Sequence, residues 1–410
     1  METPLLRLGL VGCSWFALRA HLPSLLALEE ASSLPFRLRL TALCSRTRKS
    51  TARAEARVGR PLTKHKQMEA MFSDREVDVV LLVLPIPLVA RAVELALRAG
   101  KHVISEKPAA QSSEEAIRLL RLQSELTQPT PVWTVVENWA HKPSLLWIRD
   151  RLQEGAIGAL YGAHCSHQQV VRAKGWDEGW RGGAEQEGAW LVDMGVHWGW
   201  IKFDSVAAAA TVSLSLRASE AKGSDGAAGC VSLPMLTLLG ERGSLCWWGE
   251  EDGARIQMNR ATEGSSEHAF HDEWITGGVQ QAMEDALSHV VRESRRRSTS
   301  IGARVLANGR LEWPCRVTCE EAALDLALVD SLLLSSRTAR AVEPETMLGR
   351  YGLLCSPARP LVDASCSRRS LPLLRVRCLS ERDVLSALEL ARSRGLKLPH
   401  EELLKRVTVM

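Results

Sequence analysis

The sequence predicts an α/β domain with a doubly wound parallel sheet, followed by an α+β domain with a mostly antiparallel, open sheet. Short apolar strand-like segments alternate with helical segments up to about residue 137, which is typical of parallel strands joined by crossover helices. Beyond about residue 160, longer strand-like segments follow one another with turns between them. We expect the first domain over residues 1–137, the second over 138–345 and a basic extension over 346–410.

The composition is that of an ordinary globular protein. Hydrophobic residues make up 45% of the 410 residues and charged residues 24%, and the formal net charge of +4 is too small to indicate nucleic-acid binding. No apolar run reaches the roughly 20 residues of a membrane span, so we expect no membrane association. The 10 cysteines are scattered without a CxxC pair, which favours a reduced, cytoplasmic setting and no metal site built on cysteine.

The first strand-to-helix turn has the pattern of a phosphate-binding turn. Leu5–Val11 reads as a buried strand, and the chain then turns into a helix that ends near Glu30. Such a turn aims backbone N–H groups and a helix N-terminus at a pyrophosphate. The candidate cofactor-binding residues of this turn are Gly12, Ser14, Trp15 and Ala17. Ser14 stands where a second glycine is usual, so this turn alone is weak evidence for a dinucleotide.

The end of the second expected strand, Phe36–Cys44, indicates which dinucleotide would bind. An acidic residue there would bond to a free ribose 2′-hydroxyl, whereas Ser45 and Arg46 suit a 2′-phosphate. They favour NADP over NAD. The alternative is that Ser45 and Arg46 belong to the basic first turn of a surface helix, and the two interpretations are about equal when this segment is taken alone.

A lysine follows the fifth expected strand. The apolar run Val77–Leu84 ends at Pro85, a helix over Leu88–Ala99 follows, and Gly100 suits its C-terminal end. The short strand Val103–Ser105 then leads into Glu106, Lys107 and Pro108. A lysine at the carboxyl edge of a parallel sheet is a candidate for catalysis. An isolated Glu-Lys-Pro is more often a solvated surface pair. We expect a further helix capped by Ser112 or Ser113 and a sixth strand over Pro131–Val136.

The second expected domain contains an acid–imidazole pair at helical spacing. Asp193 and His197 lie four residues apart, so on a helix they share one face, and a carboxylate there can position an imidazole for proton transfer. A structural pair is the alternative. Tryptophans at 176, 180, 190, 198 and 200 surround this motif and suit either packing or a sugar-stacking surface. A metal site from His164, His167, Asp193 and His197 is disfavoured, because strand alternation sends the first two to opposite faces.

The later segments predict a sheet and a closing helix. We expect strands over 163–172, 206–216, 227–239 and 244–248, and a helix over 318–336. Glu293 opens a polar stretch that we expect to be an irregular insertion reaching about Cys315. The extension over 346–410 carries 12 Lys/Arg against 6 Asp/Glu.

Taken in order, the motifs resemble the glucose-fructose oxidoreductase/inositol dehydrogenase (Gfo/Idh/MocA) family. The resemblance rests on the Gly12 turn with His21-Leu22-Pro23, on Leu84-Pro85, on Gly100–Pro108, on Glu137-Asn138-Trp139 and on the motif Gly188–His197. It implies an N-terminal Rossmann domain that binds NAD or NADP, with Lys107 beside the nicotinamide. It also implies that Leu84, Pro85, Glu106, Lys107, Asn138, Trp180 and Arg181 contribute to the cofactor site.

The resemblance implies an oxidoreductase acting on a sugar, polyol or related secondary alcohol or carbonyl. In that interpretation the catalytic residues are Lys107, Asp193 and His197: His197 is the acid/base, Lys107 polarises the substrate oxygen, and Asp193 orients the substrate hydroxyl or the imidazole. The resemblance also implies a homodimer or larger homo-oligomer. Two alternatives stay open, a non-catalytic nucleotide-binding sensor or scaffold of the same fold, and elimination or glycoside cleavage through transient oxidation.

Overall fold

The structure is a computed structural model of the chain. It describes residues 3–126, 130–171, 192–193, 195–198, 206–220, 232–250, 253–271, 273, 276–295, 304–305, 311–312 and 318–338. The expectations for Trp180, Arg181 and the extension over 346–410 lie outside these residues.

The first third of the chain folds into a six-stranded parallel sheet, as predicted. The strand order is β3-β2-β1-β4-β5-β6, so the direction of winding reverses between β1 and β4. In open α/β sheets such a switch point leaves a crevice outside the carboxyl ends of the strands, where ligands bind. The strands are β1 (Leu5–Val11), β2 (Arg37–Cys44), β3 (Thr63–His65), β4 (Val79–Leu82), β5 (His102–Glu106) and β6 (Trp133–Val136).

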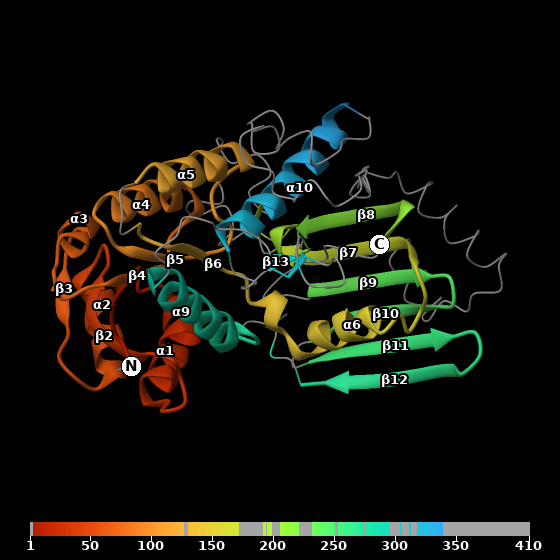
Figure 1. Cartoon of the computed structure of the whole chain (residues 1–410), viewed down its shortest axis with the longest axis horizontal. Helices are drawn as coiled ribbons and strands as arrows, with labels where there is room; N and C mark the ends of the chain where they lie inside the picture. The colour runs from red at the N-terminus through yellow and green to blue at the C-terminus, as the bar shows by residue number, and fades with distance from the viewer. Residues whose placement is uncertain are drawn as a thin grey trace.

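Helices cover both faces of this sheet (Figure 1). On one face lie α3 (Met68–Phe72), α4 (Ile86–Arg98) and α5 (Ser113–Glu125), and on the other lie α1 (Leu22–Glu30) and α2 (Arg48–Val58). Helix α4 begins two residues earlier than expected, because its prolines occupy the cap and first turn, where no intrahelical N–H partner is needed. The Ser112 hydroxyl caps α5 by accepting from the Glu115 N–H.

Two late helices complete the parallel-sheet domain. Helix α9 (Val279–Arg295) places Ala282, Met283 and Leu287 in the core beneath α1, and helix α10 (Cys319–Thr338) packs beside α5 on the opposite face (Figure 1). The expectation of an irregular insertion starting at Glu293 was therefore wrong at its start. Helix α9 runs to Arg295, with an apolar stripe at helical spacing that ends at Val291, and a basic residue suits a helix C-terminus.

The second sheet has six strands in the order β12-β11-β10-β9-β7-β8. Strands β7 and β8 pair in parallel, and the other pairs that the structure describes in this sheet are antiparallel, which confirms the predicted mostly antiparallel sheet. Strands β11 and β12 were missed, since polar residues dilute their alternation. The strands are β7 (Leu160–Val171), β8 (Val206–Glu220), β9 (Ser232–Gly240), β10 (Gly243–Gly249), β11 (Ala254–Arg260) and β12 (Gly264–Phe270).

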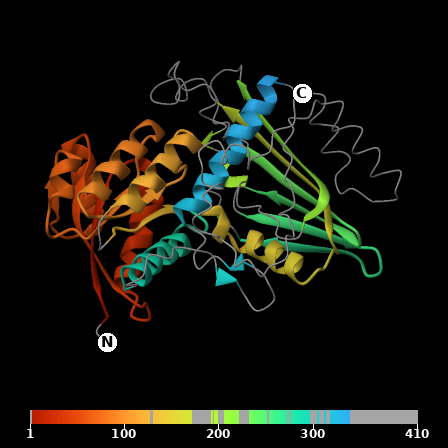
Figure 2. The ribbon, with the colours of Figure 1, turned by 45° about the horizontal axis from the view of Figure 1, so that its top comes forward.

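Helix α6 (Pro143–Gln153) covers one face of the second sheet (Figure 2). Its Leu145 and Ile148 pack with Trp247 and Ile256 in a third core cluster. A short two-stranded pairing, β13 (Arg304–Val305) with β14 (Leu311–Glu312), lies within the stretch expected to be irregular.

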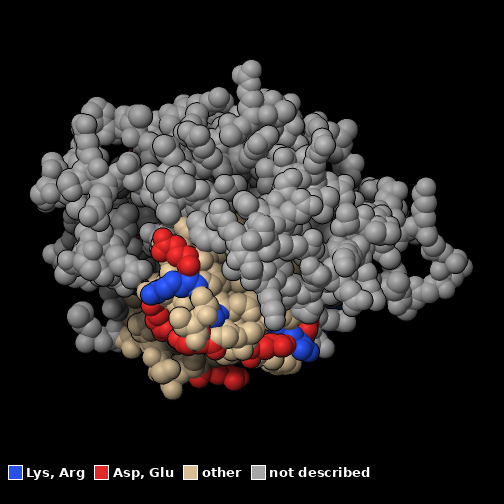
Figure 3. All heavy atoms as spheres, turned by 90° about the vertical axis from the view of Figure 1, so that its right-hand side faces the viewer, with Lys and Arg blue, Asp and Glu red and all other residues tan. Residues whose placement is uncertain are grey.

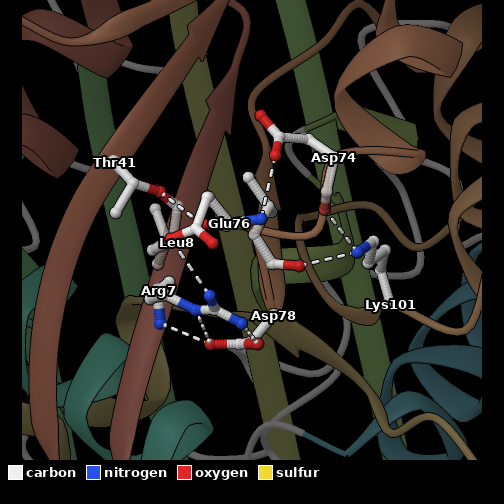
Figure 4. Close-up of polar contacts among 8 residues, drawn as sticks. Arg7, Leu8, Thr41, Asp74, Glu76, Asp78 and Lys101 are labelled. Atoms are coloured by element: carbon white, nitrogen blue, oxygen red, sulfur yellow. Dashed lines mark hydrogen bonds and ion pairs between the residues drawn. The ribbon is translucent and has the colours of Figure 1, made fainter.

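An ion-pair network ties β1 to β4 near the start of β4, away from the carboxyl edge (Figure 4). The Arg7 guanidinium donates to both Asp78 carboxylate oxygens at 2.9 and 2.7 Å, and the Arg7 N–H donates to the same carboxylate at 2.9 Å. Lys101 Nζ donates to the carbonyls of Asp74 and Val77, each at 2.7 Å. These bonds satisfy main-chain groups near the start of β4, namely the Arg7 N–H and the carbonyls of Asp74 and Val77. The network therefore fixes the amino-terminal edge of the sheet.

The described surface does not suggest a polyanion-binding face where it is visible in Figure 3. On that side of the molecule, Lys and Arg side chains lie among Asp and Glu side chains rather than gathering in a patch of one sign. In the described part of the chain, none of the helices combines the length and hydropathy needed to cross a bilayer.

Candidate active site

The predicted phosphate-binding turn forms at the carboxyl end of β1. Gly12 has a φ of +93°, and a Cβ at this position would lie 2.0 Å from the Val83 carbonyl oxygen, so the turn requires glycine. Ser14 does not block the turn. Its hydroxyl accepts from the Ala17 N–H at 3.2 Å, and its own side chain is exposed. Ala17 is fully buried, where it permits close packing of the helix on the sheet.

Trp15 is the large exposed side chain of this turn. It is 62% exposed, and the Arg19 guanidinium lies 5.5 Å from the centre of its ring. Arg19 also pairs with Glu273 at 3.1 Å. The start of this helical segment therefore presents an aromatic face and a cation beside the phosphate-binding turn.

The end of β2 lies next to that turn. The Gly12 N–H donates to the Cys44 carbonyl at 2.8 Å, so the adjoining Ser45 and Arg46 are neighbours of the turn. Ser45 is half-buried and Arg46 is exposed. The helix cap of α2 is the next residue, Thr47, which accepts from the Ser50 N–H at 3.2 Å. Arg46 thus precedes the helix instead of lying in its first turn.

Leu84 and Pro85 lie at the carboxyl end of β4, where both are half-buried and Pro85 forms the cap position of α4. At the end of β6, Asn138 donates from Nδ2 to the Gly277 carbonyl at 2.9 Å. This bond links the end of β6 to the turn before α9. In the structure Asn138 therefore joins two chain segments, in addition to its predicted role in the cofactor site.

The lysine after β5 is bonded to the motif that lies 86 residues further along the chain. Lys107 Nζ donates to the Asp193 main-chain carbonyl at 2.8 Å and to its Oδ1 at 2.9 Å. The Lys107 N–H donates to Glu106 Oε2 at 3.0 Å. On its other oxygen, Glu106 pairs with His21 Nε2 at 2.6 Å, and His21 is fully buried. These contacts fix both ends of the Lys107 residue.

The imidazole of His197 is held by a carboxylate that the motif analysis did not select. His197 Nδ1 lies 2.7 Å from Glu137 Oε1, at the end of β6. The ring also stacks on Trp139, with ring centres 4.7 Å apart and planes inclined by 15°. Asp193 and His197 are 8% and 5% exposed, so the pair lies inside the protein at the carboxyl edge of the sheet.

Burial and charge set the protonation of this cluster. Burial lowers the pKa of His197, although the Glu137 charge opposes the shift. Burial alone would raise the pKa of Glu137, but the neighbouring imidazole and Lys107 outweigh it and hold the pKa of that carboxyl below its usual value. Glu137 is therefore an anion and His197 a neutral ring near pH 7. The cluster thus combines the carboxyl groups of Glu137, Asp193 and Glu106 with the His197 imidazole and the Lys107 amine.

Two residues of this cluster, His21 and Glu137, were missed as functional candidates. Both stand in segments that carried the family resemblance, but neither spacing nor composition assigned them a partner. Their partners are 85 and 60 residues away, so only the fold brings them together. The sequence offered two signals: a histidine within a largely apolar helical segment, and a carboxylate directly after a strand.

The metal interpretation gains no support from the described residues. Among them, no group of three or more His, Cys, Asp or Glu side chains is placed to hold a metal ion. The five cysteines whose side chains are described are free and buried. The side chain of His167 lies outside the described set.

Together, the switch point between β1 and β4, the glycine turn and the lysine–imidazole cluster are features of a dinucleotide-binding fold. Residues 6–130 match the family model described as "Oxidoreductase family, NAD-binding Rossmann fold" (Gfo/Idh/MocA). Residues 6–130 therefore match the NAD-binding domain of the Gfo/Idh/MocA oxidoreductase family, in agreement with the resemblance found from the motifs.

Curated relatives align with about half of this chain. A dTDP-3,4-didehydro-2,6-dideoxy-alpha-D-glucose 3-reductase from Streptomyces violaceoruber is 31% identical over 194 residues, which are 47% of this chain and 52% of the relative. Dehydrogenase FPY6 from Fusarium mangiferae is 29% identical over 196 residues, 46% of this chain and 55% of the relative. The chain therefore spans about half the length of the curated relatives that it matches.

Solved structures share the two-domain fold. An oxidoreductase from Thermotoga maritima superposes with a TM-score of 0.56 at 22% identity, over 79% of this chain and 94% of the other. A 3-ketoreductase from Actinomadura kijaniata, crystallised with NADP, gives a TM-score of 0.55 at 19% identity, over 81% of this chain and 97% of the other. At these identities the likeness establishes the fold.

Proposed function

We propose that this protein is an NADP-dependent oxidoreductase that transfers hydride between the nicotinamide and a sugar, polyol or related secondary alcohol or carbonyl. The observation that carries the proposal is the position of Lys107, held by Asp193 beside His197 at the carboxyl edge of the parallel sheet. An amine and a neutral imidazole at this edge are the groups needed to bind a carbonyl or alcohol oxygen and to move its proton.

The residues at the carboxyl edge fit a dinucleotide. Gly12 allows the tight turn, the helical segment after Ser14 starts beside it, and Ser45 with Arg46 provides a hydroxyl and a guanidinium next to the turn. Ser45 and Arg46 favour NADP because a guanidinium binds phosphate with charge-assisted hydrogen bonds. When bound, the nicotinamide accepts or supplies the hydride.

The protein residues would manage the oxygen and its proton. Lys107 donates a hydrogen bond to the substrate oxygen, and His197 takes the hydroxyl proton during oxidation and returns it during reduction. Asp193 positions the amine, as the two bonds from Lys107 Nζ indicate. Glu106 holds the Lys107 main chain.

The substrate class is supported by the names of relatives. The curated relatives include a dTDP-sugar 3-reductase and a D-xylose dehydrogenase, and a fold neighbour is a levoglucosan dehydrogenase in complex with NADH. The proposal includes a homodimer or larger assembly in the cytoplasm. Light scattering on the purified protein would give its mass in solution.

The test is cofactor titration followed by a substrate screen. Fluorescence titration with NADPH and NADH should show tighter binding of NADPH, and a screen of aldoses, polyols, keto sugars and nucleotide sugars should change the absorbance of the reduced nicotinamide. Lys107→Ala should abolish turnover and leave NADPH affinity within about tenfold, about 1.4 kcal/mol. The matched control is Lys64→Ala, which removes an exposed lysine paired with Glu55. Tight NADPH binding without turnover of any substrate would instead support the nucleotide-binding sensor.

A further inference from the structure

The bond between Glu137 and His197 joins two parts of the protein that are far apart in sequence. Glu137 directly follows β6, and His197 lies in the short helical turn η3 (Val196–Trp198). Both side chains are more than nine-tenths buried, and Glu137 Oε1 lies 2.7 Å from Nδ1. The Trp139 N–H donates to the same carboxylate oxygen at 2.8 Å, which fixes the carboxylate independently of the histidine.

The ring of His197 is restrained in its plane as well as at one nitrogen. It stacks on Trp139, and Trp139 in turn lies 6.0 Å from Trp247, centre to centre. The Trp247 indole N–H donates to the Ser144 hydroxyl at 2.9 Å, so the aromatic support is itself fixed. Stacking sets the plane of the imidazole, and the Glu137 bond sets which edge of the ring faces the carboxylate.

The chemistry of the two groups decides the position of the ring proton. An ionised carboxylate accepts hydrogen bonds and donates none, so the nitrogen bonded to it must carry the hydrogen. The neutral ring therefore has its proton on Nδ1, and Nε2 carries the lone pair that can take a proton. A neutral group that can both accept and donate a hydrogen bond, such as a side-chain amide, would leave both tautomers of the imidazole available.

We propose that Glu137 is the positioning residue of the active site, which fixes the Nδ1–H tautomer of His197 and makes Nε2 the acid/base nitrogen. The inference rests on the proposed oxidoreductase function for its catalytic meaning, because proton transfer to a substrate oxygen needs this nitrogen. Asp193, the acidic member of the sequence motif, instead holds Lys107. The carboxylate that controls the imidazole thus comes from the nucleotide-binding sheet and not from the motif that contains the histidine.

Several charged groups act on the imidazole besides Glu137. Lys107, from the end of β5, lowers the pKa of His197, and Asp193, from the turn before η3, raises it. Helix α10 also packs against η3, and its described acidic side chains are Glu320, Asp325 and Asp330. Changes at Glu137 must therefore be compared with a variant that removes a buried carboxylate elsewhere.

The test uses Glu137→Gln in the full chain. Long-range proton–nitrogen NMR of the cofactor-free protein should show the Nδ1–H tautomer for His197 in the wild type, with the signal assigned by its loss in His197→Gln. Glutamine can either accept from Nδ1 or donate to it, so the variant should show a mixture of tautomers. This readout is independent of turnover, so it tests the tautomer even if no substrate is found.

Kinetics with NADP and an oxidisable substrate give the second readout. Glu137→Gln should lower kcat by about 100-fold or more, the range of a general-base contribution, while NADPH affinity stays within about twofold. Loss of the Glu137 charge should also move the acidic limb of the oxidation pH profile to lower pH by about one unit or more. Glu137→Asp keeps the charge, so it should restore the Nδ1–H tautomer and return the limb toward the wild-type position.

The matched control is Glu29→Gln, which removes a carboxylate of α1 that is paired with Arg60. It should change neither the tautomer nor the pH profile. The proposal is overturned if wild-type His197 carries its proton on Nε2. It is also overturned if Glu137→Gln keeps the wild-type tautomer and rate, or if Glu137→Asp, folded by circular dichroism, shows the same mixed tautomers as Glu137→Gln.

Discussion

Lys107 and Asp193 form a two-point contact between the nucleotide-binding sheet and the histidine motif. The amine donates to the main-chain carbonyl of Asp193 at 2.8 Å and to its carboxylate at 2.9 Å. Because the carbonyl contact does not depend on the side chain, the main-chain bond should survive substitution of Asp193. The carboxylate supplies the charge that holds the amine in one orientation.

Asp193→Asn should therefore lower kcat without releasing the cofactor. We expect a loss of about 10- to 100-fold in kcat, because the amine keeps a neutral partner but loses its charge-assisted bond, and an NADPH affinity within about twofold. Steady-state kinetics and fluorescence titration measure the two quantities. Asp150→Asn, at a half-exposed pair with Arg149, is the control. A parallel loss of NADPH binding would show that Asp193 supports the cofactor site instead.

Arg46 should determine the choice between NADPH and NADH. Its side chain is exposed directly after β2 and before the α2 cap, so it is available to a 2′-phosphate. Arg46→Ala should weaken NADPH by about 10-fold or more and leave NADH nearly unchanged, since the lost bonds are charge-assisted. The control Arg53→Ala removes an exposed arginine within α2. Equal weakening of both cofactors would mean that Arg46 does not contact the 2′-phosphate.

Alanine substitutions at Gly12 and Gly59 distinguish the effect of a steric clash from that of backbone strain. Both have positive φ, +93° and +74°, but a Cβ at Gly59 meets no atom within 4 Å, whereas one at Gly12 would lie 2.0 Å from the Val83 carbonyl oxygen. Gly59→Ala should cost about 1 kcal/mol of unfolding free energy, and Gly12→Ala distinctly more, about 3 kcal/mol. Urea unfolding followed by circular dichroism measures both. Equal losses would contradict the tight β1 turn.

Acid should weaken the Arg7 network once the pH falls toward the lowered folded pKa of Asp78. Burial opposes ionisation of Asp78, yet its bonds to Arg7 hold the pKa of this carboxyl below its usual value, and the Glu76 N–H does the same for the pKa of Asp74. A carboxyl with a lowered folded pKa stabilises the protein above its unfolded pKa of about 3.9 and loses that contribution as pH falls through the folded pKa.

Asp78→Asn should remove this pH dependence. The variant should be less stable than the wild type at pH 7, and the difference should shrink as the pH falls below about 4. Thermal unfolding between pH 2.5 and 7 measures it. Glu263→Gln, at an exposed surface pair with Arg260, should follow the wild-type curve. A constant difference at every pH would show that Asp78 acts by packing and not by charge.

The sequence predicted the parallel sheet well because its signals are local. Apolar strands such as β1, a glycine at the first turn and caps such as Ser112 act over a few residues, so they can be read without the fold. The motif spacing likewise predicted that Asp193 and His197 belong to one site. The Glu137 partner of the His197 ring was not predictable from spacing, because this pairing depends on how β6 meets η3.

The segments that were missed contain polar residues that obscure their apolar pattern. No element was expected over residues 249–292, and a polar insertion was expected from Glu293, although Ala282, Leu287 and Val290 form a buried stripe of helix α9. Strands β11 and β12 carry polar side chains on the face opposite α6, which weakens their apolar alternation.

Helices α9 and α10 give the protein a particular order of maturation during synthesis. Cores on both sides of the parallel sheet stay incomplete until residues 279–338 have left the ribosome, because Met283, Leu287 and Leu326 fill them. The six strands of the parallel sheet all lie within the first third of the chain. Part of the apolar surface of this sheet therefore stays exposed while the second sheet is synthesised. A fragment that ends at residue 137 would therefore expose apolar core surface and bind chaperones, and it would not fold into an independent cofactor-binding domain.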